Sequence, residues 1–406
     1  MKSDKEGTPR SFRKFLLNPM KAFNLGLRGR IERFILDYLL FENKLKSSLG
    51  WSFIFWIMIL RFNPYYCADL LNAYTDHLRH EYVSWAFLQV GFKVFSTPLG
   101  EIASQVYALH PHLTWEMHPS LHPLGMVFYF LPFGILSNLG ILNDFLVHKL
   151  MVFSFLVAAY LCVHHFMLEW KESRLGLCTY ILAPILFYLS TTFWALNGFY
   201  DVIPVLLIIL SIQAHKRNAY FEGVLFLAGA MFMHYRALMY FPLLIYLLYR
   251  LWRWNKTKIY VYRKYIAVSI VLITGLLIGY TFYLSFIDGK WLIPTMWQTS
   301  PVYLLDLKDM YLFFLFLAVT FGVLFYLFRK GEVLSSAILG LFWTYISLTS
   351  SWGHWHCLFF FPAILLPNNK QSKECIFLWL LLSMYFLGGF INPAWIVSLI
   401  SKMFLG

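Results

Sequence analysis

The stretch from Tyr265 to Leu284 reads YIAVSIVLITGLLIGYTFYL and contains no charged residue. A run of about 20 apolar residues is long enough to cross the hydrocarbon core of a bilayer as a helix. The whole chain has this character, because it is 60% hydrophobic and only 13% charged, against roughly 25% charged residues in a soluble domain. Since backbone groups in lipid must be satisfied internally, every span should be helical. The sequence therefore predicts an all-α, polytopic transmembrane bundle.

Further apolar runs lie on both sides of this stretch, and together they predict about ten to thirteen spans. The other candidate spans are 49–63, 121–137, 149–167, 175–191, 201–214, 219–233, 237–250, 309–328, 333–350, 357–367 and 375–391. A short apolar tail at 393–405 would add a half-span.

Basic residues orient these spans, because cytoplasmic loops carry an excess of Lys and Arg. The cytoplasmic segments are then the arm 1–48, His215–Arg217, the basic cluster 250–264, Arg329–Lys330, and Lys370 with Lys373. The opposite face receives 64–120, 191–201, 234–236, 285–308 and 351–356. The long outer loop 64–120 fits this assignment, since it holds two basic and five acidic residues.

The span count between 120 and 191 conflicts with this orientation. Three apparent spans lie there, at 121–137, 149–167 and 175–191, although both ends should face outside. Either one of the three is partial or re-entrant, or a further span lies in 84–99.

Residues 1–48 form a basic arm that precedes the transmembrane domain 49–406. The arm carries eleven Lys or Arg and five Asp or Glu. Apolar residues recur at helical spacing between Gly29 and Phe41, which predicts a helix lying on the cytoplasmic surface; a disordered basic tail is the alternative. The net charge of +13 is explained by anionic membrane lipids, and nucleic acid is not expected as a partner.

The outer loop 64–120 carries most of the polar chemistry. Its segment Tyr82–Phe95 predicts a helix in the outer membrane interface. Six of the thirteen histidines fall between 77 and 122, but they form no compact ligand motif. We therefore assign no metal ligands, while imidazoles beside carboxylates leave a divalent cation open as a cofactor.

The order of several motifs resembles the GT-C superfamily of membrane glycosyltransferases. The quoted segments are His118-Pro119-Ser120-Leu121-His122-Pro123-Leu124, Asn197-Gly198-Phe199-Tyr200-Asp201, Glu222-Gly223-Val224-Leu225, and His234-Tyr235-Arg236-Ala237 with Phe241-Pro242. An acidic residue shortly after the first span and interfacial helices in the first outer loop are also similar to that family. The likeness covers most of 49–250 and is weaker beyond.

The resemblance implies a GT-C-type bundle that moves a sugar from a polyprenyl-phosphate donor to a lipid, glycan or protein acceptor. The reaction would occur on the outer or lumenal face of a bacterial inner membrane or of the endoplasmic reticulum. Tyr74-Thr75-Asp76 is similar to the mannosyltransferase that adds the first mannose to GPI anchors, which suggests mannose as the sugar. This chain has Leu78 where that family has the second acid of its Asp-x-Asp motif.

Sugar transfer needs a base for the acceptor hydroxyl and positive charge for the phosphate leaving group. Asp76 is the first candidate for the base and Glu101 a weaker one; a solvated acid or a helix N-cap is the alternative for Asp76. Arg236 is the first candidate for the phosphate, because Arg binds phosphate bidentately. An ion pair with Asp201, or snorkelling, is the alternative for Arg236, and Arg79 is a second phosphate candidate.

The remaining candidate substrate-binding residues are polar side chains at the predicted outer face. They are His80, His118, His122, Asn197, Asp201, His234, Tyr235, His354 and His356. His354 and His356 alternate with tryptophans. This segment could stack on a sugar ring, or it could belong to an aromatic belt at the membrane interface. The loop 285–308 would cover the site.

Three other functions compete with glycosyl transfer. A transporter or flippase for lipids or polysaccharides would show inverted repeats and broken helices, and no clear internal repeat is present. A membrane O-acyltransferase would use an intramembrane histidine such as His165 or His234. A non-catalytic GT-C-like subunit of a larger complex is the third alternative.

Overall fold

The structure is a computed structural model, and it describes residues 76–107, 119–170, 177–196, 198–253, 258–288, 307–349 and 358–386. All regular elements in these ranges are helical, so the predicted all-α class is confirmed for them. The basic arm 1–48 with its predicted surface helix, the first span 49–63 and the tail 393–405 lie outside the described residues.

The first half of the described chain contains three short elements and four helices of 15 residues or more. In order these are α6 (Asp76–Val90), α7 (Lys93–Ser96), α8 (Leu99–Ile102), the 3-10 helix η1 (Ala103–Gln105), α9 (Leu124–Asn138), α10 (Asp144–Trp170) and α11 (Leu177–Leu196). The expected helix Tyr82–Phe95 is thus present as α6 and α7, which begin earlier and are separated at Gly91. Gly91 has a φ of +60°, a left-handed conformation that glycine adopts without steric cost.

The second half begins with two helical hairpins and ends with three further helices. Its elements are α12 (Val202–Lys216), α13 (Tyr220–Met233), the 3-10 helix η2 (Tyr235–Tyr240), α14 (Phe241–Arg253), α15 (Lys258–Phe282), the π-helix η3 (Tyr283–Asp288), α18 (Leu307–Arg329), α19 (Val333–Thr349), the 3-10 helix η4 (Phe361–Leu365) and α21 (Lys370–Phe386). The helices agree with the predicted spans in this half, with one exception.

The exception is the segment 357–367, of which the structure describes a short helical stretch: an α-helical turn at 358–360 that leads directly into η4. Its longest described element is η4, with five residues, and Pro362 stands near its start. The side chains from Leu358 to Leu366 are buried. The residues directly before 358 lie outside the described part of the chain, so the span at 357–367 stays a prediction.

Two described helical stretches are long and apolar enough to cross a membrane, Leu146–Trp170 in α10 and Val261–Asp288 in α15 and η3. The helices α9, α11, α12, α13, α18 and α19 contain shorter apolar stretches. Of the three spans predicted between 120 and 191, α9 is the shortest, with 15 residues against 27 in α10 and 20 in α11.

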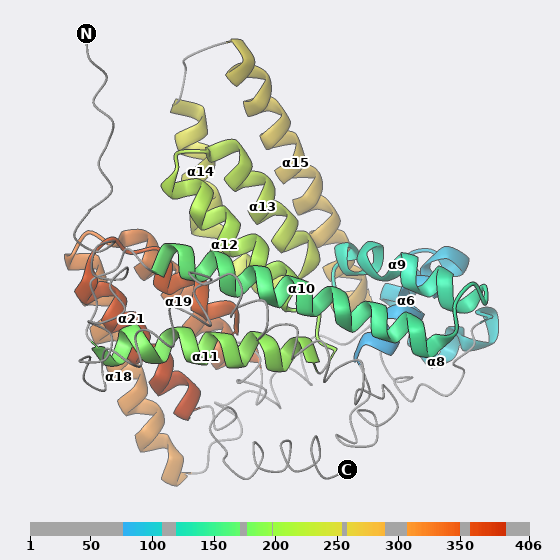
Figure 1. Cartoon of the computed structure of the whole chain (residues 1–406), viewed down its shortest axis with the longest axis horizontal. Coiled ribbons are helices and arrows are strands. Elements are labelled where there is room, and N and C mark those ends of the chain that lie inside the picture. The colour runs from blue at the N-terminus through green and yellow to red at the C-terminus, as the bar shows by residue number, and fades with distance from the viewer. Residues whose placement is uncertain are drawn as a thin grey trace, which may run out of the picture. The chain divides into compact units, whose positions relative to one another are not determined.

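Helix α13 packs against α12, α14 and α15, while α10 packs against α11 and α12 (Figure 1). Helix α6 packs closely against α9, and Gly134 makes this approach possible. A Cβ atom at Gly134 would lie 3.1 Å from the Glu81 carbonyl oxygen. The third group of neighbours is α18, α19 and α21.

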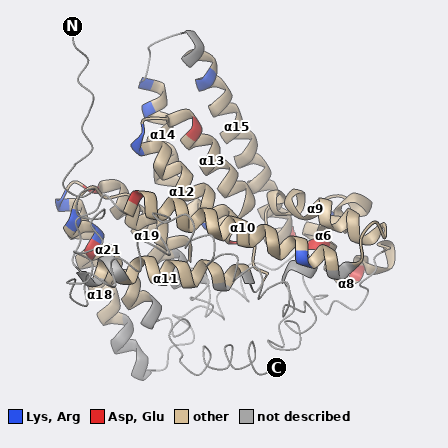
Figure 2. Ribbon diagram, viewed as in Figure 1, with Lys and Arg blue, Asp and Glu red and all other residues tan. Residues whose placement is uncertain are grey.

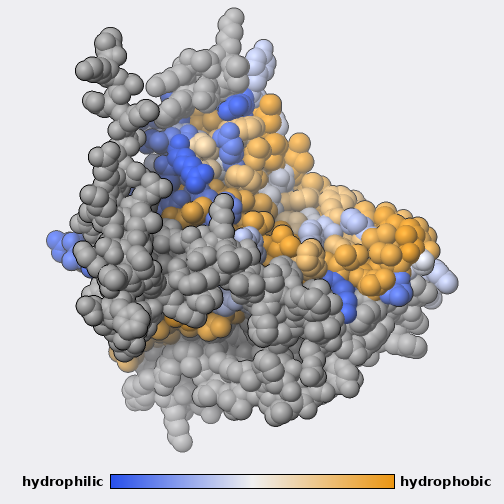
Figure 3. Space-filling view, viewed as in Figure 1, coloured by the Kyte–Doolittle hydropathy of each residue, from blue (hydrophilic) through white to orange (hydrophobic). Residues whose placement is uncertain are grey.

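Charge and apolar surface are segregated along α14 and α15. Figure 2 shows Lys and Arg on the ends of α14 and α15 that face each other across the 254–257 connection, and mostly uncharged helix below them. The exposed residues of α15 include Leu272, Ile273 and Leu276, the last 74% exposed. Figure 3 shows apolar side chains along α15 and over α9, beside a hydrophilic patch around α14.

Candidate functional site

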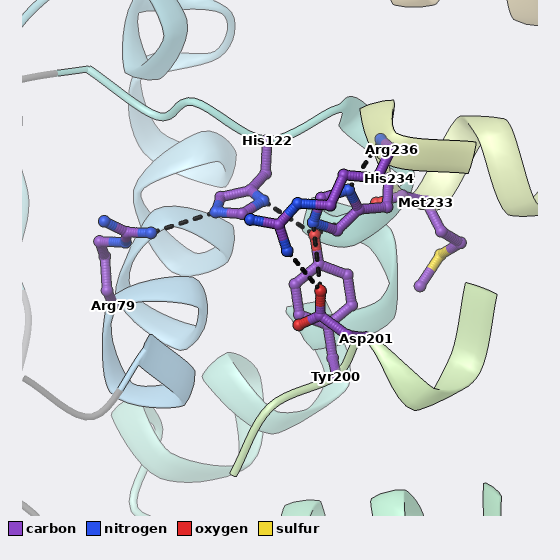
Figure 4. A network of polar contacts seen from close by, with 7 residues as sticks. All are labelled: Arg79, His122, Tyr200, Asp201, Met233, His234 and Arg236. Carbon is purple, nitrogen blue, oxygen red and sulfur yellow. Dashed lines mark hydrogen bonds and ion pairs between the residues drawn. The ribbon is translucent and has the colours of Figure 1, made fainter. Parts of the chain in front are cut away.

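Four separate segments bring polar side chains together at one buried place (Figure 4). Helix α6 supplies Arg79 and His80, and the extended segment before α9 supplies His122. The turn between α11 and α12 supplies Tyr200 and Asp201, and the turn after α13 supplies His234 and Arg236. We call these seven residues the polar cluster. All the segments were predicted to lie on the outer face, and the structure brings their side chains together.

An ion pair joins Arg236 to Asp201. The Arg236 Nη1 atom donates to Asp201 Oδ1 at 3.0 Å. Asp201 is 7% exposed, and the Arg236 side chain keeps 17% of its surface exposed. The sequence left phosphate binding and this ion pair open as alternatives for Arg236, and the structure contains the ion pair.

His234 is a neutral imidazole in this arrangement. Its Nδ1 atom accepts the backbone N–H of Arg236 at 3.1 Å, so Nδ1 carries no proton. The proton is therefore on Nε2, which lies 3.5 Å from Asp201 Oδ1. Asp201 thus faces the Arg236 cation and the neutral His234 ring. The extended backbone of His234 also ends α13, because it is incompatible with a helix.

A second chain of hydrogen bonds runs from Arg79 through His122 to Tyr200. Arg79 Nη2 lies 3.1 Å from His122 Nε2, and His122 Nδ1 lies 2.9 Å from Tyr200 Oη. Guanidinium can only donate, so His122 Nε2 accepts and the ring proton is on Nδ1. His122 then donates to Tyr200, whose hydroxyl donates to the Met233 carbonyl oxygen at 3.3 Å.

Aromatic rings enclose the polar cluster. The His80 ring meets His122 at a centroid distance of 4.6 Å and Tyr200 at 5.1 Å, both edge to face. His234 packs against Phe359 at 5.0 Å, and the Arg236 guanidinium lies 6.0 Å from the same ring. Phe359 comes from the buried segment that was predicted as a span. Its carbonyl accepts a hydrogen bond from Tyr240 Oη at 2.7 Å.

Local backbone features position the segment that carries His122. Ser120 donates its N–H to the Val94 carbonyl at 2.7 Å, and the Ser285 hydroxyl donates to the Ser120 carbonyl at 2.6 Å. At Gly125 a Cβ atom would overlap the backbone carbonyl of Phe232. The start of α9 therefore lies directly against the end of α13, next to His234.

The turn before α12 depends on Gly198. Its φ of +78° lies in the left-handed region, where glycine is the favoured residue. Its N–H bonds the Ala195 carbonyl at 3.1 Å, and the Phe199 N–H bonds the Trp194 carbonyl at 3.0 Å. This closes the end of α11 and directs the next two residues, Tyr200 and Asp201, into the cluster.

Tyr235, which lies between His234 and Arg236 in the sequence, has its hydrogen-bond partner on α15. Its hydroxyl lies 3.1 Å from Thr281 Oγ1. Burial raises the pKa of the Tyr235 phenol to about 12, against a smaller lowering by the Thr281 hydrogen bond. The phenol is therefore neutral at physiological pH.

The other predicted site residues are distributed as follows. Glu101 is exposed on α8 and is not a member of the polar cluster. Asp76 begins α6, one helical turn before Arg79 and His80, and its side chain lies outside the described part of the structure. His118, Asn197, His354 and His356 also lie outside the described residues, as does most of the loop 285–308.

A second buried pair, which the sequence analysis did not identify, contains Glu81, the residue that follows His80 on α6. Glu81 Oε2 is 3.1 Å from His148 Nε2, and the side chains are 1% and 0% exposed. Glu81 Oε1 is buried without a hydrogen-bond partner among the described residues. The pair joins α6 to α10. Tyr200 and Phe359 are the further members of the site that sequence reasoning missed.

Within the described ranges, no group of three or more His, Cys, Asp or Glu residues has an arrangement that could hold a metal ion. Comparison of the chain with protein-family models, with curated proteins and with solved structures finds no match.

Proposed function

We propose that this protein is a multi-pass membrane glycosyltransferase of GT-C type. It would transfer a sugar, with mannose as the first candidate, from a polyprenyl-phosphate donor to a lipid, glycan or protein acceptor. The acceptor would be reached on the outer or lumenal face of a bacterial inner membrane or of the endoplasmic reticulum. The polar cluster would be the place where the donor phosphate binds.

The observation that carries the proposal is the convergence of two guanidiniums, from separate segments of the chain, in the polar cluster. Its described side chains include two guanidiniums, Arg79 and Arg236, and one carboxylate, Asp201. His122 and His234 are neutral rings by their hydrogen bonds. Guanidinium matches the geometry of phosphate, so two guanidiniums that converge beside neutral rings favour a ligand that carries a phosphate.

The apolar helices support a membrane location for this cluster. Its members stand at the ends of α11, α12 and α13, where a lipid phosphate at the bilayer surface would meet them. We assign α9 as the partial element between residues 120 and 191, because it is the shortest of the three helices there. Two full spans, α10 and α11, then return the chain to the outer face.

The reaction would proceed by direct displacement at the anomeric carbon of the donor sugar. The acceptor oxygen forms a bond to that carbon while its bond to the phosphate oxygen breaks. The acceptor proton passes to a carboxylate, for which Asp76 remains the candidate, and the electron pair leaves with the polyprenyl phosphate. Arg236 and Arg79 would stabilise the charge that develops on this leaving group.

Anionic lipids are the proposed partners at the opposite end of α14 and α15. Arg250, Arg253, Arg263 and Lys264 are interleaved there with aromatic rings: Arg253 lies 5.2 Å from the Tyr249 ring and Lys264 lies 5.5 Å from the Trp252 ring. Basic and aromatic side chains together are typical of membrane interfaces.

The test is a transfer assay with the purified full-length protein in lipid nanodiscs. Polyprenyl-phosphate mannose and polyprenyl-phosphate glucose would be supplied with membrane extracts as acceptors, and release of polyprenyl phosphate would be measured. We expect the wild type to release polyprenyl phosphate from one of the two donors. Arg236→Ala should lose this release. Arg253→Ala, which removes an exposed cation from the other end of α14, is the matched control and should retain activity. Absence of release and of donor binding would reject the proposal.

The buried Glu81–His148 pair favours a second candidate, a proton-coupled transporter of lipid-linked sugars. Ionisable residues buried among apolar helices often mark proton or substrate pathways. A transporter would move intact lipid-linked sugar across proteoliposomes without cleaving it, and Glu81→Gln would stop this movement. Release of polyprenyl phosphate that survives Glu81→Gln would favour the transferase instead.

A further inference from the structure

The hydrogen bonds around His122 have only one possible direction, and this assigns a role to two residues. We propose that Tyr200 and His122 are positioning residues for Arg79. Tyr200 holds His122 in the tautomer with the proton on Nδ1, and the lone pair on Nε2 then fixes the Arg79 guanidinium. The contacts themselves are present in the structure. That they help to bind the phosphate of a polyprenyl donor rests on the proposed function.

The geometry excludes the more direct role of His122 as a base or a sugar ligand while this arrangement holds. Both ring nitrogens are engaged, Nε2 by Arg79 at 3.1 Å and Nδ1 by Tyr200 at 2.9 Å. The ring is also packed edge to face against His80. The expectation that His122 binds substrate directly is replaced by a role through Arg79.

Tyr200 suits this role because its own position is fixed. The side chain is 1% exposed and packs edge to face against His80 and Phe130. Its hydroxyl accepts from His122 and donates to the Met233 carbonyl at 3.3 Å. A partner that orients a histidine through its second nitrogen determines which tautomer the ring adopts. Arg79 is thereby held in one orientation, as a phosphate ligand requires.

Two substitutions at His122 separate its two contacts. In His122→Gln the amide oxygen reaches about as far as Nε2 and can still accept from Arg79. In His122→Asn the amide nitrogen takes the place of Nδ1 and can still donate to Tyr200, but the contact with Arg79 is lost. Binding of farnesyl phosphate to the full-length protein in detergent provides the measurement.

We expect His122→Asn and Arg79→Ala to weaken binding of farnesyl phosphate by about tenfold or more, as for loss of a hydrogen bond to a charged group. His122→Gln should bind within about threefold of wild type. Tyr200→Phe should weaken binding alone but should add nothing to Arg79→Ala, because its effect passes through Arg79. Two results would overturn the role in phosphate binding. One is an equal loss of farnesyl phosphate affinity in His122→Gln and His122→Asn, and the other is an additive loss when Tyr200→Phe is combined with Arg79→Ala.

A nitrogen-15 spectrum of the histidine side chains tests the chain of contacts without any ligand. At neutral pH we expect His122, identified by its absence in His122→Asn, to show a protonated Nδ1 and an unprotonated Nε2. If wild type binds no farnesyl phosphate but has this tautomer, the proposed function fails and the positioning of Arg79 stands. A proton on Nε2, or a fully protonated ring, overturns the positioning itself.

Discussion

Arg236 donates to Asp201 at 3.0 Å across the open end of one helical hairpin, with Asp201 directly before α12 and Arg236 shortly after α13. The pair is largely buried, and the neutral His234 ring lies on the same carboxylate oxygen. Removal of one charge from a buried pair costs more than removal of both, because the remaining charge stays desolvated. The turn that ends α13 and the turn that begins α12 are therefore coupled electrostatically.

Arg236→Met should lower the free energy of unfolding in detergent by roughly 3 kcal/mol, at the low end for buried pairs because part of the Arg236 side chain is exposed. Asp201→Asn combined with Arg236→Met should be more stable than Arg236→Met alone. The measurement is a thermal or chemical unfolding series of the wild type, both single variants and the double variant. Simple addition of the two single effects would mean that the residues do not interact.

The sequence predicted this pairing only as an alternative, and the reason is physical. Hydropathy identifies helices, because an apolar run of sufficient length has no other use in lipid, and α12, α13 and α15 follow the predicted spans closely. Hydropathy does not show whether lipid or protein surrounds an apolar run, and the apolar side chains from Leu358 to Leu366 are buried in the protein. Periodicity along one segment carries no information about which turn meets which across the bundle.

Partners distant in sequence were missed for the same reason. His148 is a single histidine in an apolar run, and its partner Glu81 lies 67 residues away. Nothing local to either residue indicates the other. For Tyr200 the sequence did contain an indication of a functional position, because this residue belongs to the motif Asn197–Asp201 between two apolar helices. Its role depends on the contact with His122, 78 residues away, which only the folded chain supplies.

Gly125 should be the most sensitive glycine of α9, because a Cβ atom there would overlap the Phe232 carbonyl. We expect Gly125→Ala to destabilise the protein by about 1–3 kcal/mol, as overpacking does. It should also displace the His122 segment from His234. Gly275→Ala on α15 is the matched control, since a Cβ atom there meets nothing within 4 Å. That change should be neutral or slightly stabilising through helix propensity, and size-exclusion profiles with unfolding curves would compare the two variants.

The two ends of the helical hairpins should lie on opposite sides of the membrane. Tyr107 is 73% exposed in the predicted outer loop, and Arg217 is exposed in the basic turn between α12 and α13. Single cysteines at these two positions would be introduced into a chain whose five native cysteines are replaced. An impermeant thiol reagent applied to intact cells should label one position and reach the other only after permeabilisation. Labelling of both from the same side would contradict the topology on which the proposed function depends.

The assignment of the base depends on Asp76, the first residue of α6. Its position one helical turn before Arg79 and His80 puts it at the start of the element that supplies the polar cluster. A base must come within hydrogen-bond reach of the acceptor hydroxyl. Asp201 is less suited to that task, because Arg236 and His234 already engage its Oδ1 atom.

Asp76→Asn keeps the shape of the side chain and removes its basicity, so the variant should fold and bind donor but lose about 10²–10⁴-fold in turnover. Glu101→Gln is the control, since Glu101 is exposed on α8, and it should retain turnover. Single-turnover release of polyprenyl phosphate, measured beside donor binding, separates loss of chemistry from loss of affinity. An inactive Glu101→Gln beside an active Asp76→Asn would transfer the role of base to Glu101. If both variants and Asp201→Asn turn over normally, the protein is better explained as a transporter, and movement of intact lipid-linked sugar becomes the activity to measure.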